Sequence, residues 1–392
     1  MGMKHHWQLS PELAYLNHGS YGATPCVVLE AQSRLRERLE RNPMQFLSPE
    51  RDLEVELDRV RQLLAGLVGA RAQDLAFVRS ATDGVNAVLG SLPLQRGDEI
   101  VVTSHGYNAC VNAAHHFARR CGAALQVAAV PFPLTGPGQV LDAVEAAFTP
   151  RTTLLLIDHV TSPTGLVFPV AELVALAHAR GVRVLIDGAH APGMIPLDIE
   201  RLGADYYTGN HHKWLCAPKA SGFLHVQPRW QQEVRPTVIS HGANRPRPGR
   251  SRFLAEFDWT GTFDPTPLLS LPAAITFLDS LYPGGIQALM AANHRLTVEA
   301  RTRLCDALQT EPPAPESMLG SLAAVLLPNG LGDAGLQARL REEFAIEVPV
   351  IDWPAADTRL LRLSLQAYNG ISDVERLIEA LKRLLGRTVR PS

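Results

Sequence analysis

The sequence predicts an α/β fold with a large domain built on a mostly parallel, doubly wound sheet and a smaller α+β C-terminal domain. Four short runs are apolar throughout, as strands covered on both faces should be: Asp98–Thr103, Ala124–Val130, Thr153–Asp158 and Val182–Asp187. Helical patterns separate them, at Tyr107–Cys121, Val140–Phe148 and Val170–Arg180. Strands that alternate with helices are typical of a parallel sheet.

The pattern changes near residue 265. Pro265 and Pro267 precede long helical patterns at Leu268–Leu281 and Ile286–Leu308. A strand, a helix, two further strands and a final helix follow: Leu322–Leu327, Leu336–Phe344 and, at the end, Asp373–Leu385. We therefore predict a large domain over residues 18–265 and a small domain over residues 266–392, which residues 1–17 are expected to join.

Composition excludes several classes of partner. The 392 residues carry 37 Lys and Arg against 39 Asp and Glu, a formal net charge of -2, so neither nucleic acid nor an anionic membrane is expected to bind. No run approaches the roughly 18 apolar residues of a membrane helix. The first residues contain no apolar segment of the kind a secretory signal needs, which predicts a cytoplasmic protein.

The cysteines and histidines do not suggest a metal site. The five cysteines are scattered and form no C-x-x-C, which is typical of reduced thiols in a cytoplasmic protein. The pairs His115–His116 and His211–His212 are adjacent rather than at the i, i+4 spacing that places two ligands on one helical face. No metal is therefore expected.

Polar residues stand at the carboxyl ends of predicted strands, where ligands bind in an open parallel sheet. Asp158 and Asp187 each close an apolar run, and Ser80 and Thr82 follow the run LAFV and open a helix. Backbone N–H groups at a helix start bind phosphate. A plain N-cap is the alternative interpretation of Ser80 and Thr82.

A single lysine downstream of Asp187 predicts the cofactor. Lys213 lies between Asn210 and a Pro/Gly-rich turn, next to Trp214, a setting that favours burial and a lowered amine pKa. Lysine forms Schiff bases with carbonyl cofactors, and a carboxylate keeps a pyridine nitrogen protonated. Alone, Asp187 could be a helix cap and Lys213 a surface charge; together they predict pyridoxal 5′-phosphate (PLP).

Seven motifs in order resemble the class V aminotransferase family of fold type I PLP enzymes, and within it the isopenicillin N epimerase-like branch. They extend over nearly the whole chain: YLNHGSYGATP (15–25), RSATDGVN (79–86), IDHVTSPTG (157–165), IDGAHAPG (186–193), TGNHHKWL (208–215), WTGTFDPTP (259–267) and RLSLQAYN (362–369).

The resemblance implies a role for each matching residue. Lys213 would hold PLP and move protons at Cα, and Asp187 would pair with the pyridine nitrogen. Tyr107 would stack on the ring, and His190 and Ser162 would lie near the phenolic oxygen. The phosphate would be held by Ala81, Thr82, Asn210 and His212, and by Thr262 of the other subunit of a homodimer with shared active sites.

On the substrate side, the resemblance implies that Arg362 binds the α-carboxylate and that Asn17 and His18 line the site. In a strand pattern Leu361, Leu363 and Leu365 face one way and Arg362 the other, which suits a bidentate carboxylate contact. Simpler interpretations exist: a surface salt bridge for Arg362, core packing for Tyr107, and a core histidine for His18, His190 or His211.

The reaction is expected to begin with removal of the Cα proton of an amino-acid-type substrate. No cysteine lies between Phe344 and Arg359, which disfavours a cysteine desulfurase. Epimerisation or racemisation is the predicted reaction, with Tyr107, His18 and His190 as candidates for the second acid or base. The alternatives are a C–S β-lyase of cysteine conjugates or sulfoxides, an aminotransferase, and a non-catalytic PLP-fold binding protein.

Overall fold

The fold is taken from a computed structural model that describes residues 3–328, 335–354 and 358–388. Residues 1–2 and 389–392, at the ends of the predicted domains, and residues 329–334 and 355–357 within the smaller one lie outside the described residues.

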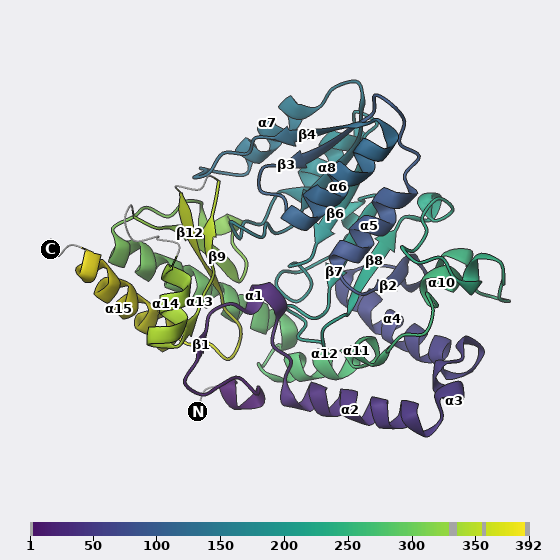
Figure 1. Cartoon of the computed structure of the whole chain (residues 1–392), viewed down its shortest axis with the longest axis horizontal. Helices are drawn as coiled ribbons and strands as arrows, with labels where there is room; N and C mark the ends of the chain where they lie inside the picture. The colour runs from purple at the N-terminus through teal and green to yellow at the C-terminus, as the bar shows by residue number, and fades with distance from the viewer. Residues whose placement is uncertain (1–2, 329–334, 355–357, 389–392) are drawn as a thin grey trace.

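A seven-stranded sheet forms the centre of the larger part (Figure 1). Its strands follow the spatial order β2 (Leu75–Val78), β8 (Gly222–Val226), β7 (Tyr206–Asn210), β6 (Arg183–Gly188), β5 (Thr152–Asp158), β3 (Glu99–Thr103) and β4 (Ala124–Ala128). Neighbours from β7 to β4 are parallel, and β8 is antiparallel to both β7 and β2. The predicted mostly parallel sheet is confirmed.

Each face of this sheet has its own apolar core, because successive side chains of a strand point to opposite faces. In β5, Leu155 and Ile157 join one core and Leu154 and Leu156 join the other. The first core includes side chains of α4 (Glu54–Val68), α7 (Gly138–Ala147), α8 (Val170–His178) and α12 (Leu271–Ser280). The second includes α5 (Ala81–Ser91), α6 (Asn108–Cys121) and α10 (Arg252–Phe257). The apolar runs in the sequence are therefore strands covered on both faces.

The smaller part packs helices on an antiparallel sheet of order β11 (Val350–Asp352), β12 (Arg359–Ser364) and β9 (Leu322–Leu326). Its helices are α13 (Gly285–Leu308), α14 (Leu336–Phe344) and α15 (Ile371–Thr388). The N-terminal β1 (Ala14–Tyr15) pairs with β10 (Ile346–Glu347), and Leu16 is buried in the same core. The predicted α+β architecture is confirmed, while the boundary at residue 265 stays a prediction.

One predicted helix is wrong in its extent. The pattern at Leu268–Leu281 is divided between α11 (Thr266–Leu269) and α12, which meet at Ser270. Pro272 lies in the first turn of α12. Proline has no N–H to donate to the preceding turn, but it is well tolerated at a helix start.

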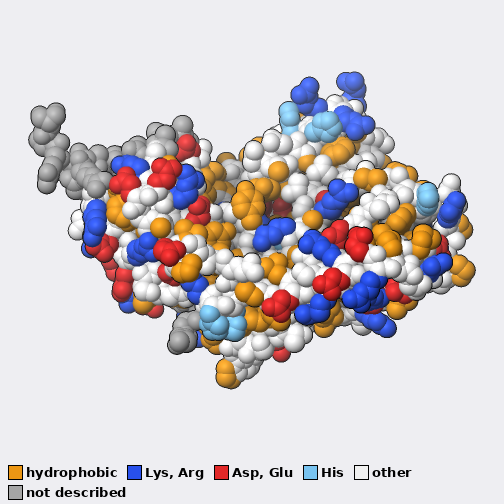
Figure 2. Space-filling view, turned by 60° about the horizontal axis from the view of Figure 1, so that its bottom comes forward, with side chains coloured by type: hydrophobic (Ala, Val, Ile, Leu, Met, Phe, Trp, Pro, Cys, Tyr) orange, Lys and Arg blue, Asp and Glu red, His pale blue; other side chains and the backbone are white. Residues whose placement is uncertain are grey.

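The remaining helices are α1 (His18–Tyr21), α2 (Cys26–Arg41), α3 (Pro43–Leu47) and α9 (Ile199–Leu202). Figure 1 shows α2 and α3 along one edge of the molecule and α1 near its middle, between the two parts. Figure 2 shows acidic and basic side chains interspersed on the face that it draws, in keeping with the near-zero net charge. Within the described ranges, no helix combines the length and apolar character needed to cross a membrane.

A buried ion pair joins α4 to the end of α10. Arg61 Nη2 lies 2.5 Å from Asp258 Oδ1, and both side chains are almost fully buried. Arg61 Nε also donates to the carbonyl of Leu75 at 2.8 Å, and Arg250 pairs with the other oxygen of Asp258. The Asp258 carboxylate therefore neutralises charge from two guanidinium groups, one of which also contacts β2.

We predict that Asp258→Asn lowers the free energy of unfolding by about 3 kcal/mol, because it removes the buried carboxylate that Arg61 and Arg250 share and leaves them the half-exposed Asp58 as counter-ion. Urea denaturation followed by circular dichroism measures this. The matched control is Glu375→Gln, which breaks the exposed pair with Arg303 and should cost under about 1 kcal/mol. Equal effects of the two substitutions would contradict the prediction.

Candidate active site

The carboxyl ends of three neighbouring parallel strands bring the predicted site residues together. Asp158 on β5 is the direct partner of Asp187 on β6, and Asp187 is the partner of Thr208 on β7. The ends of these three strands border a cavity of about 160 Å³. Its lining residues are Ser20, Tyr21, Ser80, Thr82, Tyr107, Asp158, Ser162, Asp187, Ala189, His190, Asn210, His212 and Lys213.

Lys213 follows β7 and extends its amine into this cavity. Its Nζ lies 3.0 Å from His190 Nε2, and none of the described acidic groups forms a salt bridge with it. Burial, and then the positive charge of Arg362, lower the pKa of the Lys213 amine to about 8. A substantial fraction of the amine is therefore a neutral nucleophile close to physiological pH.

His190 completes this contact as a neutral imidazole. Burial and the charge of Lys213 lower the pKa of His190 well below its ordinary value. Trp214 Nε1 donates to His190 Nδ1 at 3.4 Å. The ring proton is thus assigned to Nε2, from which it points at the neutral amine of Lys213.

Asp187 is held from two sides at the floor of the cavity. The Ala189 N–H donates to Oδ1, and the Cys110 thiol donates to Oδ2, both at 3.0 Å. Burial and the charge of Asp187 raise the pKa of Cys110 well above its ordinary value, so it remains a thiol donor. Burial, and then the charge of Asp187, also raise the pKa of Asp158. The protonated form of Asp158 is therefore favoured beside Asp187.

The other end of the cavity suits a phosphate. It is bordered by Ser80 and Thr82 at the N-terminus of α5, where backbone N–H groups favour an anion. Asn210 Oδ1 accepts from the Ala81 N–H at 2.8 Å, which fixes this turn to β7. At Gly84 a Cβ would lie 2.3 Å from Thr208 Oγ1, so glycine allows the helix to approach the strand.

Arg362 on β12 brings a buried positive charge to the rim. Its Nη1 donates to the carbonyl of Ser162 at 2.5 Å and to Ser162 Oγ at 3.2 Å, and its Nη2 donates to Ser20 Oγ at 3.1 Å. Its Nε is buried and has no partner among the described residues. Burial lowers the pKa of Arg362 to about 10, which leaves it charged at neutral pH. A guanidinium with only uncharged partners can bind an incoming carboxylate.

The N-terminal segment supports this rim from behind. His18 is fully buried, with Nδ1 2.8 Å from the Tyr368 hydroxyl and Nε2 3.0 Å from the Lys213 carbonyl. Asn17 Oδ1 accepts from Ser20 Oγ at 2.6 Å. The segment packs tightly there, since a Cβ at Gly22 would lie 1.9 Å from the His212 carbonyl. Asn17 and His18 thus support Ser20 and Lys213 and do not line the cavity.

Four other sequence candidates do not line the cavity. Ala81 and Arg362 form hydrogen bonds with residues that do line it. Thr262 is exposed on the loop between α10 and α11. His211 is buried, with its ring stacked on Phe223 and Nδ1 2.7 Å from Ser221 Oγ. His211 therefore has the core role that was its simpler interpretation.

Sequence reasoning missed Ser20, Tyr21 and Cys110 as site residues. Ser20 and Tyr21 lie inside the motif YLNHGSYGATP, so the motif was a signal for both. Cys110 stands in the first turn of α6, three residues after Tyr107, the N-cap residue of that helix. No pattern in the sequence indicates that this turn meets Asp187.

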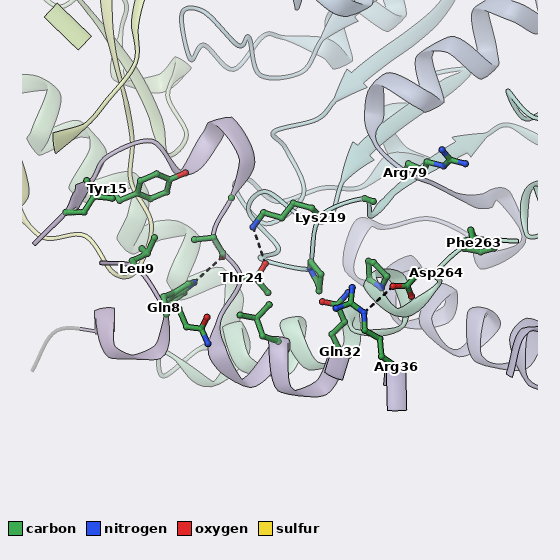
Figure 3. Close-up of a pocket in the computed structure, with 18 residues that line it drawn as sticks. Gln8, Leu9, Tyr15, Thr24, Gln32, Arg36, Arg79, Lys219, Phe263 and Asp264 are labelled. Carbon is green, nitrogen blue, oxygen red and sulfur yellow. Dashed lines mark hydrogen bonds and ion pairs between the residues drawn. The ribbon is translucent and has the colours of Figure 1, made fainter. Parts of the chain in front are cut away.

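A separate, larger cavity of about 860 Å³ lies beside the N-terminal segment and α2 (Figure 3). Lys219 Nζ donates to Thr24 Oγ1 at 3.4 Å, and Arg36 Nε lies 3.2 Å from Asp264 Oδ2. Neither Lys213 nor Asp187 lines it, so we do not place the reaction there.

Comparison with known proteins gives consistent results. A model of the family "Aminotransferase class-V" matches residues 15–377. An isopenicillin N epimerase from Amycolatopsis lactamdurans is 39% identical, over 96% of each chain. A putative L-cysteine desulfhydrase from Oryza sativa subsp. japonica is 31% identical, over 95% of this chain and 83% of its own. The solved structure of the cystine C–S lyase C-DES with cysteine persulfide has a TM-score of 0.81 at 24% identity, over 95% and 97% of the two chains; it supports the fold alone.

We predict that Lys213 in the cofactor-free protein titrates near pH 8, well below the roughly 10.4 of a free lysine. The amine is protonated below this pH and nucleophilic above it. The rate of arylation of Lys213 by fluorodinitrobenzene, followed by peptide mapping across pH, measures the midpoint. Arg362→Gln should raise the midpoint, because it removes a neighbouring positive charge. A midpoint above about pH 10 in the unmodified chain would show that Lys213 is solvated.

Proposed function

The chain belongs to the class V aminotransferase family, and from this premise we propose that it epimerises an amino acid by removing and returning the Cα proton. Its cofactor is PLP. When bound, PLP supplies the electron sink that makes a Cα proton removable. The observation that carries the proposal is the joint placement of Lys213, Asp187 and Arg362: an amine of lowered pKa, a buried carboxylate, and a buried guanidinium without an acidic partner.

The residues around the cavity fit this cofactor and an amino acid substrate. In this proposal Lys213 binds the cofactor covalently and later moves the Cα proton. Asp187 faces the pyridine nitrogen, with its carboxylate oriented by Cys110 and Ala189. Tyr107 covers the ring, and His190 and Ser162 approach the phenolic oxygen.

Other residues would bind the cofactor phosphate and the substrate carboxylate. The N-terminus of α5 binds the phosphate at Thr82, together with Asn210 and His212, while the Ala81 N–H positions Asn210 by donating to its Oδ1. Arg362 binds the substrate carboxylate, held in place by Ser162 and Ser20. Because Thr262 is exposed and does not line its own cavity, we propose that it reaches the phosphate in the second subunit of a cytoplasmic homodimer.

Epimerisation also needs an acid on the face of Cα opposite Lys213, and Tyr107 is our candidate. Both ring nitrogens of His18 are hydrogen-bonded to other groups. His190 contacts Lys213 directly and so lies on the same side as the first base. Tyr107 is 41% exposed at the cavity. Burial raises the pKa of its hydroxyl, which keeps it protonated and able to donate.

A C–S lyase is the second candidate, because L-cysteine desulfhydrases also match over most of their length. Elimination needs Lys213 as base and a leaving group on Cβ, but no acid on the opposite face. The higher identity to isopenicillin N epimerases, over 96% of both chains, favours epimerisation.

We predict that borohydride reduction of the PLP-loaded protein places a pyridoxyl group on Lys213. Lys213→Ala should lower Cα–H exchange by about 10²–10⁴-fold, the usual contribution of a positioned base. Peptide mapping and proton NMR in D2O measure the two effects. Lys219→Ala is the matched control, six residues along the chain and expected to be labelled and active. A pyridoxyl group on Lys219 would refute the assignment.

We predict that the protein brings either enantiomer of its substrate to the same mixture, with solvent deuterium entering at Cα. Chiral chromatography and NMR on L- and D-amino acids and cysteine S-conjugates test this. Tyr107→Phe should slow the change of configuration more than proton exchange from the L enantiomer, because only the second acid is lost. Stoichiometric pyruvate from a cysteine conjugate, without racemisation of any amino acid, would select the lyase instead.

A further inference from the structure

A second hollow opens directly from the rim of the active site. Its volume is about 540 Å³, against about 160 Å³ for the cavity at Lys213. The two share Tyr107 and Ser162 in their linings. Because Ser162 is also a hydrogen-bond partner of Arg362, the hollow begins where a substrate carboxylate would be bound.

The walls of this hollow come from both parts of the molecule. Val127 stands on β4, at the edge of the large sheet, and is 55% exposed. Ile351 on β11 and Trp353 form the wall on the side of the smaller domain. Trp353 Nε1 donates to the Ser104 carbonyl at 3.3 Å, and its ring packs 4.5 Å from that of His105. These contacts hold the two walls at a fixed separation.

The lining defines the chemistry of an occupant. Apolar surface comes from Val111, Val127, Ile351 and Trp353, and Asn108 adds a polar side chain. The Ser104 hydroxyl is already bonded to the Val130 backbone. The hollow's only charged lining residue among those described is Asp352, which pairs with Arg359 at 2.7 Å. Among the residues that the structure describes, no cationic side chain lines the hollow, so none of them would bind an acidic end group. A long apolar side chain without a charged end group would match this surface.

We propose that this hollow, the Val127–Ile351 groove, binds the distal part of the substrate side chain, and that the substrate is an amino acid with a long, uncharged side chain. The inference rests on the proposed function, since it places the substrate α-carboxylate at Arg362. A short amino acid such as alanine ends within the smaller cavity. A long side chain continues past Tyr107 and Ser162 and removes the apolar walls of the groove from water.

The test compares two substrates on the PLP-loaded protein: L-glutamic acid γ-(4-nitroanilide), whose side chain ends in an aryl amide, and L-alanine. Cα–H exchange in D2O gives kcat/KM for each. We expect the long substrate to be preferred by at least about tenfold, as extra apolar contact in a pocket commonly gives. Val127→Trp, which fills the groove without touching the smaller cavity, should remove most of this preference by raising KM for the long substrate. Exchange of L-alanine should change less than about twofold.

Two further variants make the result specific. Ile351→Ala weakens the opposite wall and should also raise KM for the long substrate alone. Val55→Trp is the matched control at another exposed valine, 52% exposed on α4, and should alter neither substrate. Equal use of both substrates, or a preference that survives Val127→Trp, would overturn the groove assignment and leave the proposed function standing. If neither amino acid exchanges its Cα proton or alters the absorption spectrum of bound PLP, the proposed function fails and the groove assignment fails with it.

Discussion

The burial of a guanidinium without an acidic partner is the constraint on which the site depends. Arg362 is held only by the uncharged oxygens of Ser162 and Ser20, and its Nε has no partner in the described part of the chain. An unpaired buried charge is unfavourable unless other groups solvate it. Burial first, and then the same charge, lower the pKa of Lys213. Arg362 is therefore able to bind an anion, and it also contributes to the nucleophilicity of the Lys213 amine.

This arrangement requires segments that are far apart in the sequence. The main sheet supplies Asp187 and the loop of Lys213, β12 supplies Arg362, and the N-terminal segment supplies Ser20. His18 connects the last to the loop of Lys213 through the Lys213 carbonyl. The apolar cores on both faces of the sheet hold these strand ends rigidly, and rigid placement of charge is what makes electrostatic stabilisation effective.

The neighbouring titratable groups are kept uncharged, and this gives Asp187 a distinct role. Burial favours the neutral forms of Asp158, Cys110 and His190. Asp187 receives hydrogen bonds from a thiol and an amide but no salt bridge from a described cation. Its carboxylate is thereby left to face a ligand. These groups lie around the strand ends of the central sheet. The groove beyond Tyr107 and Ser162 is separate from them, and there we propose that the substrate side chain is selected.

The sequence by itself determined the α/β architecture, the position of most strands and helices, and the cofactor. It could do so because doubly covered strands must be apolar throughout, and because few chemistries need an Asp at a strand end and a Lys in a buried turn downstream. It predicted one helix where Pro272 begins a new one, since the periodicity continues through the break. Only the tertiary structure decided that Asn17 and His18 lie behind the cavity, that Cys110 donates to Asp187, and that Arg362 lacks an acidic partner. These are contacts between residues tens to hundreds of positions apart, and they depend on which strand ends meet in space, which no local pattern encodes.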